Sequence, residues 1–183
     1  MIILITGASH TGKTLLAQRM LEKYKYPYLS VDHLKMGLIR SGNTGLTPED
    51  DDELTAYLWP IVREMIKTAV ENRQNMIVEG CYIPEDWRRD FDDRYSESIR
   101  CICLIMSDGY IDDHLDEIIR HESDIENRTD AAAVAAEELK NDNRVYMERC
   151  RRNGDLQVLI ESDYEGAISA IPDFDTTEKE ERK

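Results

Sequence analysis

The sequence is poor in the features that mark secreted, metal-bound or membrane-spanning proteins. Its 183 residues include four cysteines. Two of them, Cys101 and Cys103, are close in the sequence, but no other Cys or His cluster has the spacing that would complete a zinc site. Cys101 and Cys103 are expected on one face of a buried strand, while Cys81 and Cys150 stand alone, so no disulfide framework is expected. No apolar run approaches the roughly 18 residues that span a bilayer, and Met1–Gly7 lacks the basic flank of a signal peptide. We therefore expect a cytoplasmic protein.

Positive charge is also scarce. The chain has 23 lysines and arginines against 38 aspartates and glutamates, which gives a net charge of −15. Such a protein repels nucleic acids and anionic membrane surfaces, so neither is expected as a partner. The first quarter of the chain is the exception, because residues 1–46 contain six basic and two acidic side chains. A basic segment in an acidic protein indicates a local site for an anion.

The length of the chain fits one domain, in which apolar runs of strand length alternate with amphipathic stretches of helical length. Short apolar runs separated by helices are typical of a parallel sheet that is covered on both faces. We therefore predict an α/β fold. The expected strands are Ile2–Thr6, Tyr26–Val31, Asn75–Gly80, Ile99–Met106 and Gln157–Glu161.

An amphipathic helix is expected after residue 47. Thr47 is predicted to cap this helix and Pro48 to be its first residue, while Pro60 is expected to kink or split it near Trp59. Further helices are expected over residues 110–128 and 131–152.

Residues 7–14, with the sequence GASHTGKT, fit the P-loop or Walker A pattern G-x-x-x-x-G-K-[ST]. The pattern lies between a predicted strand and a predicted helix, as it requires. Its glycines let backbone N–H groups converge on a phosphate, and the helix N-terminus adds positive potential. Lys13 is predicted to bridge the β- and γ-phosphates in catalysis, and Thr14 to bind Mg²⁺. The predicted nucleotide-binding residues are Gly7, Ala8, Ser9, His10, Thr11, Gly12, Lys13, Thr14 and Leu15.

Two carboxylates follow predicted strands at the edge of the sheet where a P-loop lies. Asp32 could accept a proton from an attacking hydroxyl or hold a Mg²⁺-bound water, or it could cap a helix that begins at His33. Glu79 ends an apolar strand, which is the layout of a Walker B metal-binding position. We therefore predict Asp32 as a catalytic residue, and Glu79 together with Thr14 as the metal-binding residues.

Several arginines could bind anionic groups. Arg120 and Arg128 follow the fourth strand and could close over the phosphates, although they could equally form surface ion pairs with Asp124. Arg40 and Arg63 flank the segment where an acceptor would bind, and each could hold an anionic substrate or lie on the surface. We predict Arg120 and Arg128 as catalytic residues.

Two other classes of nucleotide-binding protein are excluded. The sequence has no G-x-G-x-x-G fingerprint, which argues against a dinucleotide-dependent oxidoreductase. It also has no N-K-x-D motif at a distance from the P-loop that suits guanine recognition, which argues against a regulatory GTPase.

With its P-loop, Asp32, Glu79 and later arginines, the chain resembles the small P-loop kinases. These include adenylate, shikimate and gluconate kinases, chloramphenicol phosphotransferase and zeta-toxin kinases. The resemblance implies a three-layer fold with a five-stranded parallel sheet of order 2-3-1-4-5, an acceptor-binding segment at about Leu34–Leu58 and a helical lid at about Glu117–Asp130. The kinase domain would cover residues 1–172, followed by a charged, frayed tail over 173–183.

The resemblance also assigns roles to residues. It implies that Asp32 binds or deprotonates the acceptor, that Arg120 and Arg128 are lid arginines, and that the backbone at Ser162–Tyr164 contacts adenine. The sequence departs from adenylate kinases, because Lys13 is followed directly by a threonine. Their Asp-Gly-hydrophobic-Pro-Arg motif is represented by residues 79–84, which lack the arginine.

The predicted function is phosphoryl transfer from Mg-ATP to a small-molecule acceptor. One alternative is a nucleoside monophosphate kinase with the same fold. Another is an ATP-binding regulatory or toxin-like protein whose P-loop serves binding or acts on a special target. The sequence names neither the acceptor nor an oligomeric state.

Overall fold

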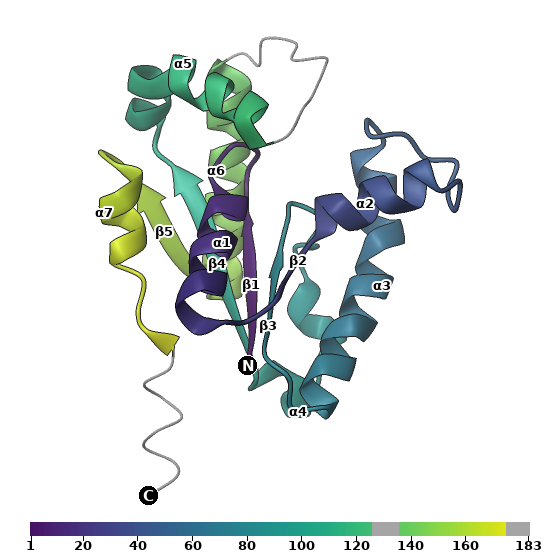
Figure 1. Ribbon diagram of the computed structural model, residues 1–183. Coiled ribbons are helices and arrows are strands. Elements are labelled where there is room, and N and C mark those ends of the chain that lie inside the picture. Colours follow the sequence, from purple (N-terminus) through teal and green to yellow (C-terminus); the bar gives the residue numbers. More distant parts are fainter. Residues whose placement is uncertain (126–135, 175–183) are drawn as a thin grey trace, which may run out of the picture.

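The computed structural model describes residues 1–125 and 136–174, and its centre is a five-stranded parallel sheet (Figure 1). The strand order β2-β3-β1-β4-β5 confirms the predicted α/β fold and its topology. All five predicted strands are present, each within two residues of its expected bounds. They are β1 (Ile2–Gly7), β2 (Tyr28–Ser30), β3 (Met76–Glu79), β4 (Ile99–Met106) and β5 (Leu156–Ile160).

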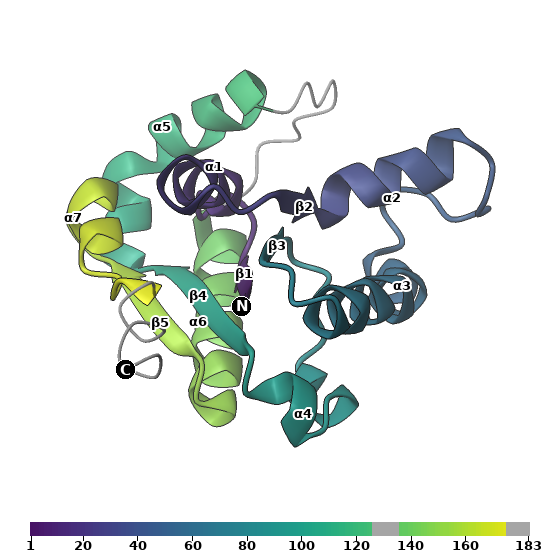
Figure 2. The ribbon, with the colours of Figure 1, turned by 60° about the horizontal axis from the view of Figure 1, so that its bottom comes forward.

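Helices follow most of the strands and cover both faces of the sheet. Figure 1 views the sheet with α1 in front of it and α6 behind it, and Figure 2 shows α2 and α3 extending to one side, beyond β2 and β3. The helices are α1 (Lys13–Tyr24), α2 (Val31–Arg40), α3 (Asp51–Glu71), the 3-10 turn η1 (Trp87–Asp90), α4 (Asp93–Ser96), α5 (Asp108–Ile125), α6 (Ala136–Asn153) and α7 (Tyr164–Ser169).

The alternation of side chains along β1 divides the core into two layers. Ile3 and Ile5 pack in the cluster that includes α1, whereas Ile2 and Leu4 pack in the cluster that includes α3. All six residues of β1 are buried, as expected for the central strand of a sheet covered on both faces. Within residues 1–125 and 136–174, no helix is both long and apolar enough to cross a bilayer.

Helix α3 differs from its prediction at both of the expected landmarks. It begins at Asp51 instead of Pro48, and residues 47–50 form a separate turn before it, in which the Asp50 carboxylate accepts hydrogen bonds from the backbone N–H of Thr47, at 2.7 Å, and from its hydroxyl, at 3.0 Å. The helix also continues through Pro60 for 21 residues without being split. Pro60 lies on the exposed side, while the buried Trp59 next to it anchors the helix to the core, so packing outweighs the one backbone hydrogen bond that proline removes.

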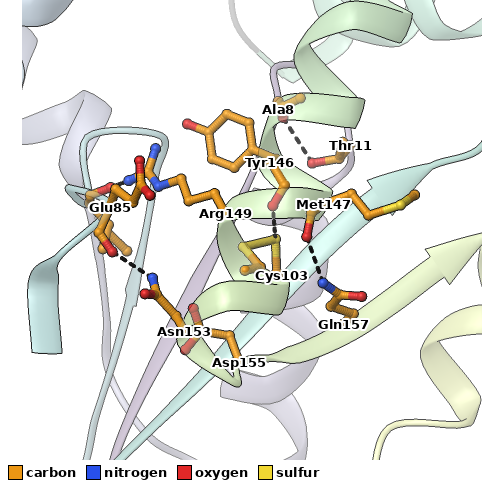
Figure 3. The surroundings of a disulfide bond; sticks show 12 residues. Ala8, Thr11, Glu85, Cys103, Tyr146, Met147, Arg149, Asn153, Asp155 and Gln157 are labelled. Carbon is orange, nitrogen blue, oxygen red and sulfur yellow. Dashed lines mark hydrogen bonds between the residues drawn. A yellow bond between two sulfur atoms is a disulfide. The ribbon is translucent and has the colours of Figure 1, made fainter.

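A disulfide joins Cys103 of β4 to Cys150 of α6 (Figure 3). The expectations of no disulfide and of a solitary Cys150 are therefore wrong, although Cys101 and Cys103 are buried as predicted. The two cysteines are 47 residues apart in the sequence, and their Cα atoms lie 6.4 Å apart because α6 returns across β4. This proximity is created by the tertiary fold and leaves no local signal in the sequence. Cys81 and Cys101 are free thiols.

Candidate active site

The loop between β1 and α1 has the sharply curled backbone of a P-loop. Gly7 and Gly12 have positive φ angles of 143° and 80°, which favour glycine. Space requires glycine as well. A Cβ on Gly7 would collide with the carbonyl oxygen of Leu104, and a Cβ on Gly12 would lie 2.6 Å from the ring of Tyr164. The two fixed positions of the predicted pattern are therefore the two places where a side chain cannot fit.

The carbonyl group of Ala8 organises the interior of this loop. It accepts hydrogen bonds from the Thr11 hydroxyl, at 2.9 Å, and from the Lys13 ammonium, at 2.7 Å. Lys13 is almost completely buried, so its charge is held inside the curl of the backbone. Leu15 lies in the first turn of α1 with an exposed side chain, and any role in nucleotide binding falls to its backbone.

Glu79 lies at the end of β3, with its neighbours in the sheet being Ile5 of β1 and Ser30 of β2. It is 1% exposed, and neither carboxylate oxygen has a hydrogen-bond partner in the described part of the chain. Burial raises the pKa of Glu79; the Ser30 and Thr14 hydroxyls and the Lys13 charge act in the opposite direction. An acidic group buried without a partner is costly, which makes this position a candidate for binding a cation.

Asp32 lies close to these residues, and its negative charge contributes to the raised pKa of Glu79. Helix α2 begins at Val31, with Ser30 at the N-cap position, so the alternative interpretation of Asp32 as a cap for a helix starting at His33 is wrong. The fold thus brings together four of the predicted residues from three segments of the chain: Lys13, Thr14, Asp32 and Glu79.

A chain of buried polar contacts, which was not predicted from the sequence, runs from Asp32 to α3. The buried Lys35 ammonium lies 3.0 Å from the Asp32 carboxylate and donates to the Tyr82 hydroxyl at 2.8 Å. Tyr82 in turn donates to Asp51 at 2.9 Å, and burial raises its pKa. The i,i+3 spacing of Asp32 and Lys35 was the only signal that could have suggested part of this chain.

A cleft of about 640 Å³ lies beside the P-loop. It is bounded by Ser9 of the P-loop, the first half of α3, the segment 81–85 that follows β3, and one side of α6. Only the last part of the predicted acceptor segment 34–58 lines it. No pattern in the sequence indicated that α6 would contribute, because this helix follows the site by more than fifty residues and reaches it through the tertiary fold.

Tyr164 makes a contact with the P-loop that was not predicted from the sequence. Its hydroxyl donates to the carbonyl oxygen of Gly12 at 2.7 Å, and its ring covers Gly12. Tyr164 begins α7 and is also covered by the guanidinium group of Arg19, 5.7 Å from the ring centroid. The predicted adenine-contacting segment, residues 162–164, therefore adjoins the P-loop.

The predicted arginines are only partly placed by the structure. Arg120 belongs to α5, but its side chain is outside the described part of the molecule, and Arg128 lies wholly outside the described residues. Arg40 is exposed, and Arg63 pairs with Glu64 at 2.8 Å; neither lines the cleft.

A P-loop between the first strand and first helix of a parallel sheet ordered 2-3-1-4-5 defines the fold of the small P-loop kinases, which confirms the predicted class. The profile of a family described as an AAA domain matches residues 2–109, more than half of the chain, and the protein belongs to this family. No curated protein matches the sequence.

Solved structures of kinases share this fold over almost their full length. Shikimate kinase from Aquifex aeolicus VF5 is 16% identical, with a TM-score of 0.55 over 99% of this chain and 98% of that one. Deoxyadenosine kinase from M. mycoides is 15% identical, with a TM-score of 0.54 over 100% of both chains. A gluconokinase from Sinorhizobium meliloti 1021 is 13% identical, with a TM-score of 0.51 over 91% of this chain and 86% of that one. At these identities the likeness is one of fold.

Proposed function

We propose that the protein transfers the γ-phosphoryl group of ATP, bound with Mg²⁺, to a hydroxyl group of a small molecule. The observation that carries this proposal is the Glu79 carboxylate, which is buried beside Lys13 and Thr14 of the P-loop and has no hydrogen-bond partner among the described residues. The kinase fold of its structural neighbours supports the same class of reaction.

The P-loop supplies the site for the triphosphate. Its backbone N–H groups and the N-terminus of α1 would face the phosphates. The Lys13 ammonium now donates to the Ala8 carbonyl, and we expect it to exchange this neutral acceptor for phosphate oxygens, which form stronger charge-assisted hydrogen bonds. Lys13 would then neutralise negative charge on the transferred group.

The residues around Glu79 fit a divalent cation. Carboxylate and hydroxyl oxygens are the ligands that Mg²⁺ prefers, and Mg²⁺ commonly takes few protein ligands because nucleotide phosphates and waters complete its shell. Consistent with this, no group of three or more His, Cys, Asp or Glu residues within 1–125 and 136–174 is arranged to hold a metal. Thr14 and Glu79 would hold the ion, directly or through water. When bound, Mg²⁺ neutralises phosphate charge.

Asp32 is proposed to orient the acceptor hydroxyl and to take its proton. The hydroxyl oxygen forms a bond to the γ-phosphorus, the bond to the ADP oxygen breaks, and the hydroxyl proton passes to the Asp32 carboxylate. Lys35, 3.0 Å away, holds this carboxylate in place. Arg120 and Arg128 are proposed to complete charge stabilisation and to exclude water, which would otherwise compete with the acceptor.

The test is ADP release from Mg-ATP in the presence of a panel of alcohols, with Lys13→Ala as the inactive variant. Lys23→Ala is the matched control, since it removes a lysine at the exposed end of the same helix. We expect acceptor-dependent ADP release that Lys13→Ala lowers by about 100-fold or more and that Lys23→Ala leaves unchanged. Equal activity in Lys13→Ala would contradict the proposal. ATP binding without transfer to any acceptor would favour the regulatory or toxin-like alternative.

A further inference from the structure

The cleft beside the P-loop has an unusual balance of charge. Among the lining residues within 1–125 and 136–174, four carry carboxylates and one, Arg149, carries a positive charge. The carboxylates come from three separate segments, so the acidic character belongs to the cavity and not to one helix. They are Asp51 and Asp52 of α3, Glu85 of the segment after β3, and Asp142 of α6.

The two arginines beside the cleft, Arg149 and Arg152, do not balance its four carboxylates. Arg149 donates a hydrogen bond to the carbonyl oxygen of Ile83 and lies over the ring of Tyr146, 5.1 Å from its centroid. Arg152 pairs with Glu85 at 2.7 Å. The buried ammonium of Lys35 faces Asp32, and its charge is therefore compensated on the side of the P-loop.

Two of the carboxylates have no cationic side chain as a partner in the described part of the chain. Neither Asp52 nor Asp142 has a hydrogen bond or an ion pair with any residue of the described ranges, and Asp51 accepts only the neutral hydroxyl of Tyr82. Burial raises the pKa of Asp142, and the negative charges of Glu138 and Asp51 raise it further. The carboxylates of α3 and α6 thus repel each other across the cleft, and a cation between them would turn this repulsion into attraction.

The rest of the wall suits an organic cation. The lining includes the aromatic side chains of Trp59, Tyr82 and Tyr146, which can bury part of a carbon skeleton. The volume of about 640 Å³ accommodates a small molecule rather than a single ion.

The cleft also adjoins the groups that would carry out phosphoryl transfer. Ser9 of the P-loop is part of its wall, as is Cys81. Tyr82, also in the wall, accepts a hydrogen bond from Lys35 at 2.8 Å, and the Lys35 ammonium lies 3.0 Å from the Asp32 carboxylate. A ligand in the cleft would therefore lie next to the P-loop and the proposed catalytic carboxylate.

We propose that the acceptor is an alcohol that carries a protonated amino group. Its ammonium would lie between the carboxylates of Asp52 and Asp142, its skeleton against the aromatic wall, and its hydroxyl toward Asp32 and the P-loop. This inference rests on the proposed kinase function and names the substrate class of the same site. Sugar acids and nucleoside monophosphates are disfavoured, because the uncompensated charge of the cleft would repel their carboxylate and phosphate groups.

The experiment compares amino alcohols with derivatives that differ in charge. The probes are ethanolamine, glucosamine and 2-deoxystreptamine, each beside the derivative in which every amino group is acetylated. Gluconate, shikimate and AMP are the anionic acceptors. ADP release and equilibrium binding are both measured, at neutral pH. We expect at least one amine to be phosphorylated with a kcat/KM at least about tenfold above its N-acetyl derivative, which corresponds to about 1.4 kcal/mol.

Variants then test whether the preference for amines depends on the carboxylates of the cleft. The double variant Asp52→Asn with Asp142→Asn should raise KM for the amine about tenfold or more and leave ATP binding unchanged. Glu97→Gln removes a like charge from an exposed position just before β4, at the opposite end of that strand from the site, and should change neither. These substitutions remove no hydrogen bond from the described structure, so the folded state should be retained, and circular dichroism checks this.

The outcomes separate this inference from the function on which it rests. Absence of ATP binding and of any ADP release would overturn the kinase proposal. Efficient transfer to a neutral or anionic acceptor, with no preference for amines, would overturn only the inference about the acceptor. The same follows if ATP binds and no amine binds or is phosphorylated, or if the double variant retains the wild-type preference for an amine.

Discussion

The P-loop edge of the sheet and the cleft beside it adjoin each other but are built in different ways. The edge is largely local: residues 7–14 form one continuous loop that is defined by two glycines, a lysine and backbone groups. The cleft combines side chains from the P-loop, α3, the segment after β3 and α6. The P-loop offers backbone N–H groups and the Lys13 ammonium to an anion, whereas the lining of the cleft carries four carboxylates, so a nucleotide and a cationic acceptor would each meet groups of opposite charge.

The largest effect is expected from the variant Glu79→Gln, which changes the P-loop edge and leaves the lining of the cleft unchanged. We expect about a 100-fold or greater loss of Mg²⁺-dependent kcat, because a carboxylate ligand of the proposed metal site is replaced by a neutral amide. Stability should rise by about 1–3 kcal/mol at pH 7, because an unpaired buried charge is removed. Steady-state kinetics and urea unfolding measure the two effects. Retained activity together with lower stability would show that Glu79 has a structural role instead.

Loss of the disulfide should affect the cleft and spare the edge. Cys150→Ser removes the disulfide between α6 and β4 and should lower the free energy of unfolding by about 2–4 kcal/mol, in line with typical disulfides. Because α6 lines the cleft but not the P-loop, KM for the acceptor should rise while KM for ATP stays constant. Reduction of the wild-type protein should lower its stability to that of the variant and leave the variant unchanged. A reductant-insensitive wild type would contradict the role assigned to Cys103 and Cys150.

The link between the two regions can be tested at Tyr82. Tyr82→Phe removes the hydroxyl that accepts from Lys35 and donates to Asp51, and should lower stability by about 1–3 kcal/mol because buried polar groups lose a partner. We expect a several-fold rise in acceptor KM. Tyr57→Phe is the control, since its hydroxyl donates to the exposed Asn43 carbonyl at 3.1 Å. Equal effects of the two variants would argue against the buried polar chain.

The smallest expected effect is a pH dependence of stability that arises at the edge. Burial raises the pKa of Glu79 above its ordinary value of 4.5, so the folded protein binds this proton more tightly than the unfolded chain. The stabilisation of the folded state by this tighter proton binding is fully present below about pH 4.5. It is lost as the pH rises through the folded pKa of Glu79, and the free energy of unfolding changes by at most about 1.4 kcal/mol per pH unit.

Unfolding titrations of wild type and Glu79→Gln across this range measure the difference, and Glu97→Gln serves as the control for an exposed carboxyl group. Matching pH profiles for wild type and Glu79→Gln would mean that the pKa of Glu79 is not raised in the folded protein. Mg-ATP should reduce the difference, because a bound cation favours the charged carboxylate.

The elements that could be predicted are those whose signals lie within a few residues. Strand β4 was located to the residue because eight apolar-rich positions form one buried run. The P-loop was located because its chemistry requires a fixed spacing. Pro60 and Thr47 misled the prediction of α3. The packing of the buried Trp59 keeps the helix continuous at Pro60, and residues 47–50 form a separate turn before the helix begins at Asp51.

The sequence by itself determined the α/β architecture, the P-loop and the placement of Glu79 at the end of β3 and of Asp32 just after β2, because apolar periodicity and motif spacing are local properties of the chain. The tertiary structure decided which distant side chains meet. It joined Cys103 to Cys150, placed Tyr164 over Gly12, linked Lys35 to Asp51 through Tyr82, and closed an acidic cleft with α6. Each of these contacts depends on how helices return across the sheet, a geometry that is fixed only when the whole core packs.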